Sequence, residues 1–224
     1  MKLSIIIPVF NEAENIAVTL SQLQCYRQQG HEVIVIDGGS QDNTIDRVKD
    51  LADKLLISKL GRAVQMNVGA EKANGEVLVF LHVDTTLQEN TEGLIADVLA
   101  QGYQWGRFNV RLSGRHILFR IIEAMMNWRS CLTGIATGDQ VIFVQTEMFK
   151  KVGGYPEIKL MEDIELSKCL KRLKKPACIN QAVITSSRKW EKNGILITVL
   201  LMWRIRILYF FGVSPDKLFS QYYR

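Results

Sequence analysis

The feature that most constrains this chain is a continuous run of apolar and β-branched residues from Leu3 to Val9. A strand that is apolar at every position is typical of a parallel sheet covered by helices on both faces. Similar short runs return along the chain, and segments with helical periodicity separate them, so we predict a doubly wound α/β sheet. In the first half of the chain, residues 1–100, we expect strands at residues 3–9, 32–37, 54–58 and 77–81. The helices that we expect between them include 44–52 and 62–72.

The helix after the first strand carries a start signal. Asn11 is followed three residues later by Glu14, which is the spacing of a capping box. Ile16, Leu20 and Leu23 then recur on one helical face. We therefore expect a helix that follows Asn11 closely and packs on the sheet through this face.

The second half of the chain, from residue 101, alternates less regularly. Its last predicted helix has Asp163 in line with Leu166 and Leu170, which places an acid at the start of a helix that returns to the core. The elements that we expect in this half are a strand at 105–112, a helix at 116–131, a strand at 140–145 and a helix at 162–174.

A long apolar segment lies near the carboxyl end, where 15 of the 19 residues from Ile195 to Val213 are apolar. Arg204 and Arg206 interrupt it, and each arginine near the middle of a membrane span costs about 2.5 to 3.5 kcal/mol. This cost disfavours a full span. It leaves packing on the rest of the protein or on a second copy in a homodimer, and peripheral contact with a membrane. We expect a domain at 1–190, with halves at 1–100 and 101–190, and a helical tail at 191–224.

The net charge of +5 is concentrated in the tail. The last 37 residues hold seven Lys or Arg against two acids, whereas residues 1–187 balance at 21 against 21. Proteins that bind nucleic acid more often spread a basic stripe with interleaved aromatics over the folded face. The charge pattern therefore argues against a nucleic acid partner and favours a membrane surface or an anionic substrate.

The four cysteines, at positions 25, 131, 169 and 178, have the spacing of neither a zinc knuckle nor a small disulfide scaffold. We expect them to be core residues. The opening apolar run is too short for a secretory leader, which predicts a cytoplasmic protein, either free or at the inner face of the membrane.

Acids and small residues follow three of the predicted strands, in the stretches PVFNE at 8–12, DGGSQDNT at 37–44 and HVDT at 82–85. Ligands of open parallel sheets bind beyond the carboxyl ends of the strands. Acids from three loops at one edge repel each other unless a cation or a donor-rich ligand lies between them. The sequence therefore predicts a ligand site at this edge.

These loops also carry a resemblance to a known family. The segments SIIIPVFNEAENI, IDGGSQDNT, GRAVQMNVGA, VLVFLHVDT and GGYPEIKLMEDIEL occur in the order found in the inverting family 2 glycosyltransferases, and they extend over about residues 3–167. The segments GRAVQMN and HVDT and the tail look most similar to a bacterial subgroup, the selenium-domain-associated and arsenosugar-type transferases. The resemblance implies a GT-A type, Rossmann-like, mostly parallel sheet flanked by helices, followed by the apolar helical tail.

The resemblance also implies the partners, which are a nucleoside diphosphate sugar donor and an unidentified hydroxyl acceptor. A UDP-sugar is the expected donor, and a GDP-sugar is the other candidate. Pro8, Phe10, Asn11 and Glu12 match the family's first nucleotide loop, in which the acid faces the base or ribose. Asp37 matches the acid that hydrogen-bonds the nucleobase, although Asp, Gly and Ser also form ordinary strand-to-helix turns.

A divalent cation, Mn²⁺ or Mg²⁺, is implied by the match of Asp84 to the family's metal ligand. The family usually reads Asp-x-Asp at this point, whereas this chain reads His82-Val83-Asp84. His82 therefore ligates the metal with Asp84, contacts the donor, or merely ends a buried strand. Arg62 and Gln65 match donor-contacting positions at a helix start, where backbone donors favour phosphate, and a solvated Arg62 is the alternative.

Asp163 matches the family's catalytic acid. An ordinary aspartic acid is ionised at pH 7, so a positioned one can take the proton of an attacking hydroxyl as a general base. The alternative is that Glu162 and Asp163 are first-turn acids that complement the helix dipole. Asp139 resembles an acidic loop that contacts donor sugar or acceptor, and it could equally be a turn acid.

Taken together, the resemblance implies a metal-assisted inverting glycosyltransferase with an Asp base. Two other classes stay open at this point. A nucleotidyltransferase uses a similar α/β plan and releases pyrophosphate. A nucleotide-sugar binding subunit without turnover would account for the departure at His82.

Overall fold

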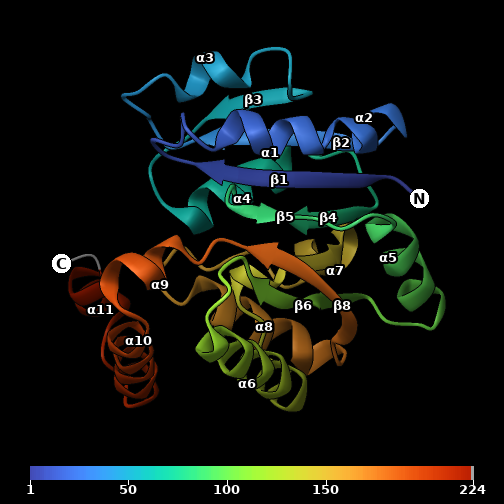
Figure 1. Cartoon of the computed structure of the whole chain (residues 1–224). Coiled ribbons are helices and arrows are strands. Elements are labelled where there is room, and N and C mark those ends of the chain that lie inside the picture. The colour runs from blue at the N-terminus through green and yellow to red at the C-terminus, as the bar shows by residue number, and fades with distance from the viewer. Residues whose placement is uncertain (223–224) are drawn as a thin grey trace.

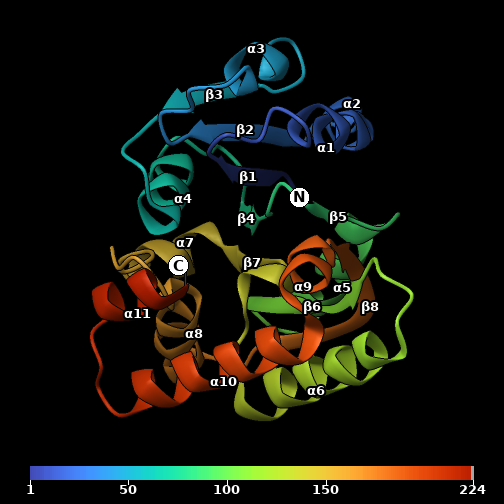
Figure 2. The same ribbon diagram turned by 60° about the vertical axis from the view of Figure 1, so that its left-hand side comes forward.

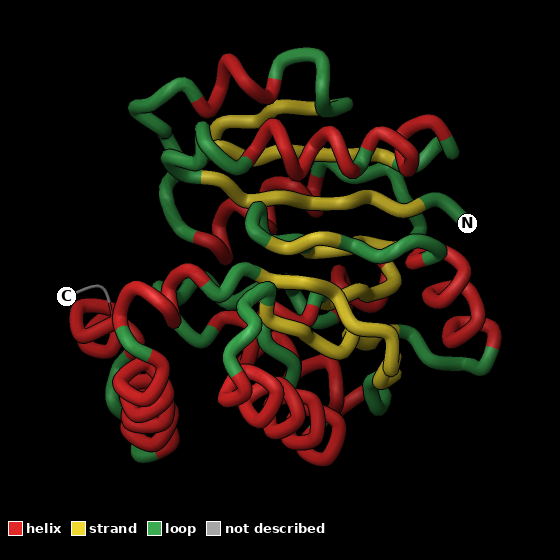
Figure 3. Tube along the Cα trace, viewed as in Figure 1, coloured by secondary structure: helices red, strands yellow, loops and turns green. Residues whose placement is uncertain are grey.

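The structure is a computed structural model that describes residues 1–222. One eight-stranded sheet, in the order β3-β2-β1-β4-β7-β6-β8-β5, runs through the molecule. Figure 3 shows its strands in yellow as a single stack. In Figures 1 and 2, helices α1 and α2 cover one face of this sheet and α4 covers the other.

The first half of the sheet is parallel, as predicted. Strand β1 pairs in parallel with β2 and β4, and β2 pairs in parallel with β3. The direction changes at β7, which is antiparallel to β4 and to β6, while β8 runs parallel to β6 and antiparallel to β5. The strands are β1 Leu3–Val9, β2 Glu32–Asp37, β3 Lys54–Ile57, β4 Val77–Phe80, β5 Thr85–Thr86, β6 Trp105–Leu112, β7 Ile142–Gln145 and β8 Ala177–Thr185.

Helices connect these strands and extend beyond the last one. The helices are α1 Ile16–Gln22, α2 Gln24–Gln28, α3 Thr44–Val48, α4 Arg62–Glu71, α5 Thr91–Ala100, α6 Ile117–Thr133, α7 Thr146–Lys151, α8 Glu162–Leu173, α9 Arg188–Asn193, α10 Ile195–Phe210 and α11 Pro215–Tyr222, with a 3₁₀ turn, η1, at Gly138–Gln140.

The two faces of the sheet carry separate apolar clusters because successive side chains of a strand point in opposite directions. In β1, Ile5 and Ile7 belong to the cluster that also holds Ile16 and Leu20 of α1. Ile6, between them, belongs to the cluster that holds residues of α4, α7 and α8. All three isoleucines are fully buried, which explains why the run is apolar at every position.

Most predicted elements are confirmed, and the α/β class with them, but three details differ. The predicted capping box is wrong: α1 begins after Asn15, without a side-chain cap, and Asn11 has a positive φ of 53° and faces another loop. The helix expected at 44–52 ends at Val48, because Lys49 is extended. The third difference concerns elements that were not predicted, which are β5, β8, α2, α5, α7 and the turn η1, and η1 includes Gln140, where a strand was expected.

The tail packs on the domain. Ile205 of α10 and Leu218 of α11 are at most 1% exposed and share a cluster with Leu160, just before α8. Helix α10 also packs on α6 through a second cluster that includes Trp190. Within residues 1–222, none of the helices combines the length and the apolar character that crossing a membrane requires.

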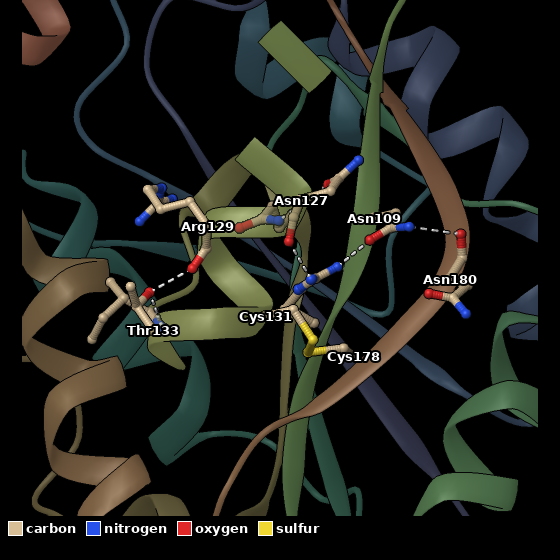
Figure 4. Close-up of a disulfide and its surroundings, with 10 residues drawn as sticks. Asn109, Asn127, Arg129, Cys131, Thr133, Cys178 and Asn180 are labelled. Carbon is tan, nitrogen blue, oxygen red and sulfur yellow. Dashed lines mark hydrogen bonds between the residues drawn. A yellow bond between two sulfur atoms is a disulfide. The ribbon is translucent and has the colours of Figure 1, made fainter. Parts of the chain in front are cut away.

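The prediction that the cysteines lie in the core is wrong. Cys131 and Cys178 form a disulfide, with a Cα–Cα distance of 5.9 Å, that joins the end of α6 to β8 (Figure 4). Cys25 is exposed and Cys169 is half-buried, and both are free. The bridge pairs residues 47 apart in the sequence, a relation that their spacing alone does not reveal.

Candidate active site

A cleft of about 450 Å³ lies beyond the carboxyl ends of the parallel strands, within the size range of small-molecule sites. Figure 1 shows the arrowheads of β1 and β8 pointing toward the side on which α9 lies. The cleft is lined by charged, amide and hydroxyl side chains: Glu12, Asn15, Asp84, Ser186, Arg188, Lys189, Lys192 and Asn193.

The loop after β1 is held by the loop after β2. The backbone N–H of Asn11 donates to Oγ of Ser40 at 2.8 Å, and its side-chain Oδ1 accepts from the N–H of Gln41 at 2.8 Å. The N–H of Glu12 donates to the Thr44 hydroxyl at 2.8 Å, which leaves the Glu12 side chain at the cleft. Two of the predicted nucleotide loops therefore form one unit.

Two other residues of that loop are less engaged. Pro8 is the next-to-last residue of β1, half-buried, and lies beside Ile36 of β2. Phe10 directly follows the strand and is 39% exposed. An exposed aromatic ring at a sheet edge offers a surface on which a base can stack.

Asp37 and Gln65 are turned into the protein. The Asp37 carboxylate is fully buried and accepts from the N–H groups of Gly39 and Ser40, both at 2.8 Å. Nε2 of Gln65, itself 3% exposed, donates to the carbonyls of Val9 and Ile36 at 2.8 Å each. Both side chains hold the ends of β1 and β2 in place, and their contact with a donor stays a prediction.

A second group of side chains meets where η1 approaches the end of β4. Nδ1 of His82 lies 3.5 Å from Oδ1 of Asp139. The N–H of Gly138 donates to Oδ2 of Asp163 at 2.9 Å, and Oδ1 of Asp163 accepts from the N–H of Ile164 at 2.7 Å. Three predicted site residues from separate segments, His82, Asp139 and Asp163, are thus brought together.

Gly138 is what allows this approach. A Cβ atom at this position would lie 2.4 Å from the His82 ring, well inside van der Waals contact. The pKa of Asp139 is lowered, because the hydrogen bond and charge of His82, together with Arg62, outweigh the burial that works to raise it. The acid is therefore held ionised beside the imidazole.

Glu162 is a site residue that sequence reasoning did not assign. Its side chain is buried, and burial together with the neighbouring charge of Asp163 raises its pKa to about 7, against the lowering effect of Arg62. Nη1 of Arg62 lies 4.0 Å from Oε1 of Glu162. Arg62 therefore faces the acids at the start of α8, on the same side as His82.

Asp84 lies at the cleft, with an exposed side chain that takes part in one long hydrogen bond, from the Thr85 hydroxyl at 3.4 Å. Among residues 1–222 no three His, Cys, Asp or Glu side chains lie close enough to hold a metal ion on their own. Mg²⁺ sites commonly use one or two carboxylates and complete the shell with substrate phosphates and water. Asp84 fits that mode of binding, in which the cation arrives with a diphosphate.

Helix α9 supplies the basic wall of the cleft, which sequence reasoning mostly missed. Nη2 of Arg188 donates to Oδ1 of Asn15 at 2.7 Å across the cleft. Burial lowers the pKa of Lys189 to about 8, with repulsion from Arg62 adding to this effect and Asp139 opposing it, so these three charges lie near one another. The excess of Lys and Arg in the tail was the sequence feature that indicated these cations, but it did not predict that they face the acids of the cleft.

Trp190, on α9, anchors the tail to the domain. It is 9% exposed and packs with Leu112, Phe119 and the start of α10. Of the remaining predicted residues, Glu12 and Asp84 line the cleft itself, and Arg62 joins the group formed by His82, Asp139 and Asp163.

The fold and the cleft define an α/β protein with an acid-lined, cation-rimmed site at the carboxyl edge of its sheet. Residues 4–128 match the family described as Glycosyl transferase family 2. The chain belongs to this family. The subgroup suggested by the sequence is not among these findings and stays a prediction.

One relative is similar in sequence over part of the chain, and two solved structures share the fold. Glycosyltransferase AglE of Haloferax volcanii is 39% identical over 90 residues, which are 36% of this chain and 30% of AglE. The structure of S. aureus TarS in complex with UDP-GlcNAc has a TM-score of 0.66 at 19% identity, over 83% of this chain and 58% of that chain. The mannosyltransferase PcManGT from Pyrobaculum calidifontis, in complex with GDP-Man and Mn²⁺, has a TM-score of 0.67 at 19% identity, over 91% of this chain and 60% of that chain. The chain thus spans less than a third of AglE and about 60% of the two solved chains.

Proposed function

We propose that this chain transfers a sugar, with inversion, from a nucleoside diphosphate donor to an acceptor hydroxyl. The observation that carries the proposal is the convergence of acids from the ends of β1 and β4, from η1 and from the start of α8 with the cations of α4 and α9. Departure of a nucleoside diphosphate places negative charge on its oxygens, and nearby Arg and Lys side chains stabilise that charge. Arg62, at the start of α4, and the cleft cations Arg188, Lys189 and Lys192 are the side chains that we propose for this purpose.

In the proposed reaction the bond between the anomeric carbon and the donor diphosphate breaks while the acceptor oxygen bonds to the opposite face of that carbon. Asp163 takes the proton that the acceptor hydroxyl loses. Both Asp163 oxygens already accept a backbone N–H, and each has a further lone pair for the proton. The two backbone hydrogen bonds hold the carboxylate in one orientation, which favours its action as a base.

A divalent cation, when bound, would offset negative charge on the departing diphosphate, and Asp84 would hold it, with His82 as a second candidate ligand. We propose a UDP-sugar as donor. TarS was solved with UDP-GlcNAc and PcManGT with GDP-Man and Mn²⁺, so both nucleotides occur among proteins of this fold.

The test is consumption of donor by the purified chain. UDP-glucose, UDP-GlcNAc and GDP-mannose are supplied separately with Mn²⁺ and a panel of hydroxyl acceptors, and the released nucleotide is identified. We expect UDP from one of the first two donors. Release of GDP alone would identify a GDP-sugar as the donor. Release of pyrophosphate would indicate nucleotidyl transfer, and tight binding without consumption would indicate a binding subunit.

Asp163→Asn should lower the rate of transfer by about 10²- to 10⁴-fold, the range expected for loss of a general base. Its affinity for the donor should stay close to that of the original chain, because the asparagine oxygen still accepts from Gly138. Glu165→Gln is the matched control, since Glu165 lies in the same turn of α8 but pairs with Lys168 and Tyr209. If Asp163→Asn retained turnover, Asp163 would not be the base and would instead be a first-turn acid that complements the helix dipole.

A further inference from the structure

Helices α6 and α10 each carry an exposed apolar stripe. Residues three or four apart lie on one side of a helix, and the stripes follow this spacing. Every side chain in them is at least half exposed. We name these ten residues the apolar face: Ile117, Ile121, Met125, Trp128 and Leu132 on α6, and Leu196, Leu200, Trp203, Ile207 and Phe210 on α10.

The opposite sides of both helices are packed, so the apolar face is the outer surface of ordered elements. Phe119 of α6 is fully buried in a cluster that holds Ile195, Val199 and Met202 of α10. Figures 1 and 2 show both helices at the end of the molecule that lies farthest from β3. The two stripes therefore belong to neighbouring helices at one end of the protein.

The surroundings of the apolar face are basic. The segments that carry and flank it, residues 111–133 and 188–222, contain ten Lys or Arg and three acids. Each acid has a partner within the protein: Glu123 is paired with Arg120 at 2.7 Å, Asp216 is paired with Lys159 at 2.9 Å, and Glu191 accepts from the Ser187 hydroxyl. The exposed cations of these segments include Arg111, Arg115, Lys192 and Arg204.

Two partners could cover the apolar face: a second copy of the chain or a lipid surface. The charge of the surrounding segments distinguishes between them. In a twofold dimer the face meets its own copy, so its cations would approach cations while the acids already have partners, and like charges oppose association. An anionic lipid surface attracts the same cations, and Trp side chains such as Trp128 and Trp203 favour the boundary between lipid and water. Helices with one apolar side bind in the plane of that boundary.

We propose that the apolar face binds the surface of a membrane that contains anionic lipids. Helix α10 follows α9 after a single residue, and α9 forms the basic wall of the cleft. Docking through α10 therefore holds the cleft beside the lipid surface. The proposal does not depend on which reaction the cleft performs.

The test is cosedimentation of the full chain with vesicles of phosphatidylcholine, with and without phosphatidylglycerol. The chain should bind the vesicles that contain phosphatidylglycerol, and added salt should weaken this binding. Replacing both tryptophans, Trp128→Glu and Trp203→Glu, should lower the affinity about tenfold or more, because each change removes apolar contact and adds a repelled charge. The matched control is Val18→Glu on α1, which alters an apolar residue that is 62% exposed outside the apolar face and should leave binding unchanged.

A second variant tests whether the weaker vesicle binding of the tryptophan variant could arise from misfolding. Arg115→Glu combined with Arg204→Glu leaves every residue of the apolar face in place and should weaken binding to phosphatidylglycerol vesicles without changing the melting temperature. Equal binding to vesicles without phosphatidylglycerol would overturn the anionic preference. Absence of vesicle binding, together with a dimer in sedimentation equilibrium that the tryptophan changes dissociate, would assign the face to a second copy and overturn the proposal.

Discussion

Glu162 and Asp163 are adjacent acids in very different surroundings. Asp163 accepts two backbone hydrogen bonds, whereas Glu162 is buried and its pKa is raised to about 7, mainly by burial and then by the charge of Asp163. A carboxyl group with a raised pKa in the folded protein holds a proton that the unfolded chain releases. Its ionisation therefore destabilises the fold.

Stability should consequently fall as the pH rises from about 4.5, the ordinary value, to about 7. At about 1.4 kcal/mol for each pKa unit, this single group accounts for about 3 kcal/mol. Urea unfolding at pH 5 and pH 7.5 measures the fall, and Glu162→Gln should reduce it by about that amount. A variant with the same pH dependence as the original chain would show that Glu162 is ionised without cost.

Asp84→Ala should remove the effect of Mn²⁺ on donor binding. The side chain is exposed at the cleft and makes one long hydrogen bond, so its loss should change stability by less than about 0.5 kcal/mol. Thermal shifts with the donor, recorded with and without Mn²⁺, make the comparison. Glu89→Ala, on the same connection and also exposed, is the control, and an unchanged Mn²⁺ response in Asp84→Ala would move the metal site elsewhere.

Sequence order could predict residues that lie close to the ends of elements. His82 lies two residues after β4 and Asp163 is the second residue of α8, and ligands of open α/β sheets bind near such positions. Gln65 shows the limit. Its place at a helix start suggests phosphate contact, but the carbonyls that it binds belong to β1 and β2, and only the folded chain shows that they lie within its reach.

At the scale of elements, β1, β2 and β6 have the expected bounds. In β1 and in the middle of β2, burial on both faces leaves a continuous apolar run. Strand β6 was predicted although Arg107, Asn109 and Arg111 interrupt its apolar residues. Strand β8 escaped prediction because Asn180 and Gln181 interrupt it, beside a register shift between Phe108 and Asn109 of β6. Polar residues at an irregular pairing resemble a loop in the sequence.

The 3₁₀ turn η1 gives the second group of site residues its geometry, and Gly138 is its tightest point. Gly138→Ala should destabilise the protein by about 1 to 3 kcal/mol, since the new Cβ would meet the His82 ring at 2.4 Å. Urea unfolding is the measurement. In a His82→Ala background the same change should cost much less, and an equal cost in both backgrounds would mean that the strain arises elsewhere.

At the scale of the whole molecule, the tail supports the site, and the boundary expected at residue 190 is untested as a domain limit. Ile205 packs beside Leu160, directly before the helix that carries Asp163. Oη of Tyr209 donates to Oε1 of Glu165 at 2.5 Å, which ties α10 to α8 a second time. Sequence pattern identified the tail as apolar and helical, but its contacts with α6 and α8 involve partners distant in the sequence.

Ile205→Ala should therefore lower the free energy of unfolding by about 2 to 5 kcal/mol, as for other large aliphatic residues in a core. The control is Ile207→Ala, two residues away and 50% exposed, which should change stability by less than about 0.5 kcal/mol. Chemical denaturation of both variants gives the comparison. Similar losses in the two would mean that α10 does not pack through the side that Ile205 occupies.

The hydrogen bond from Arg188 to Asn15 joins residues 173 positions apart, and it bears on how the protein is made. Chains leave the ribosome amino end first, and their parts fold as they emerge. The four parallel strands are complete once β4 is out, but the basic wall of the cleft arrives more than a hundred residues later, with α9. The growing polypeptide therefore acquires a complete cleft only after α9 has emerged, well after its four parallel strands.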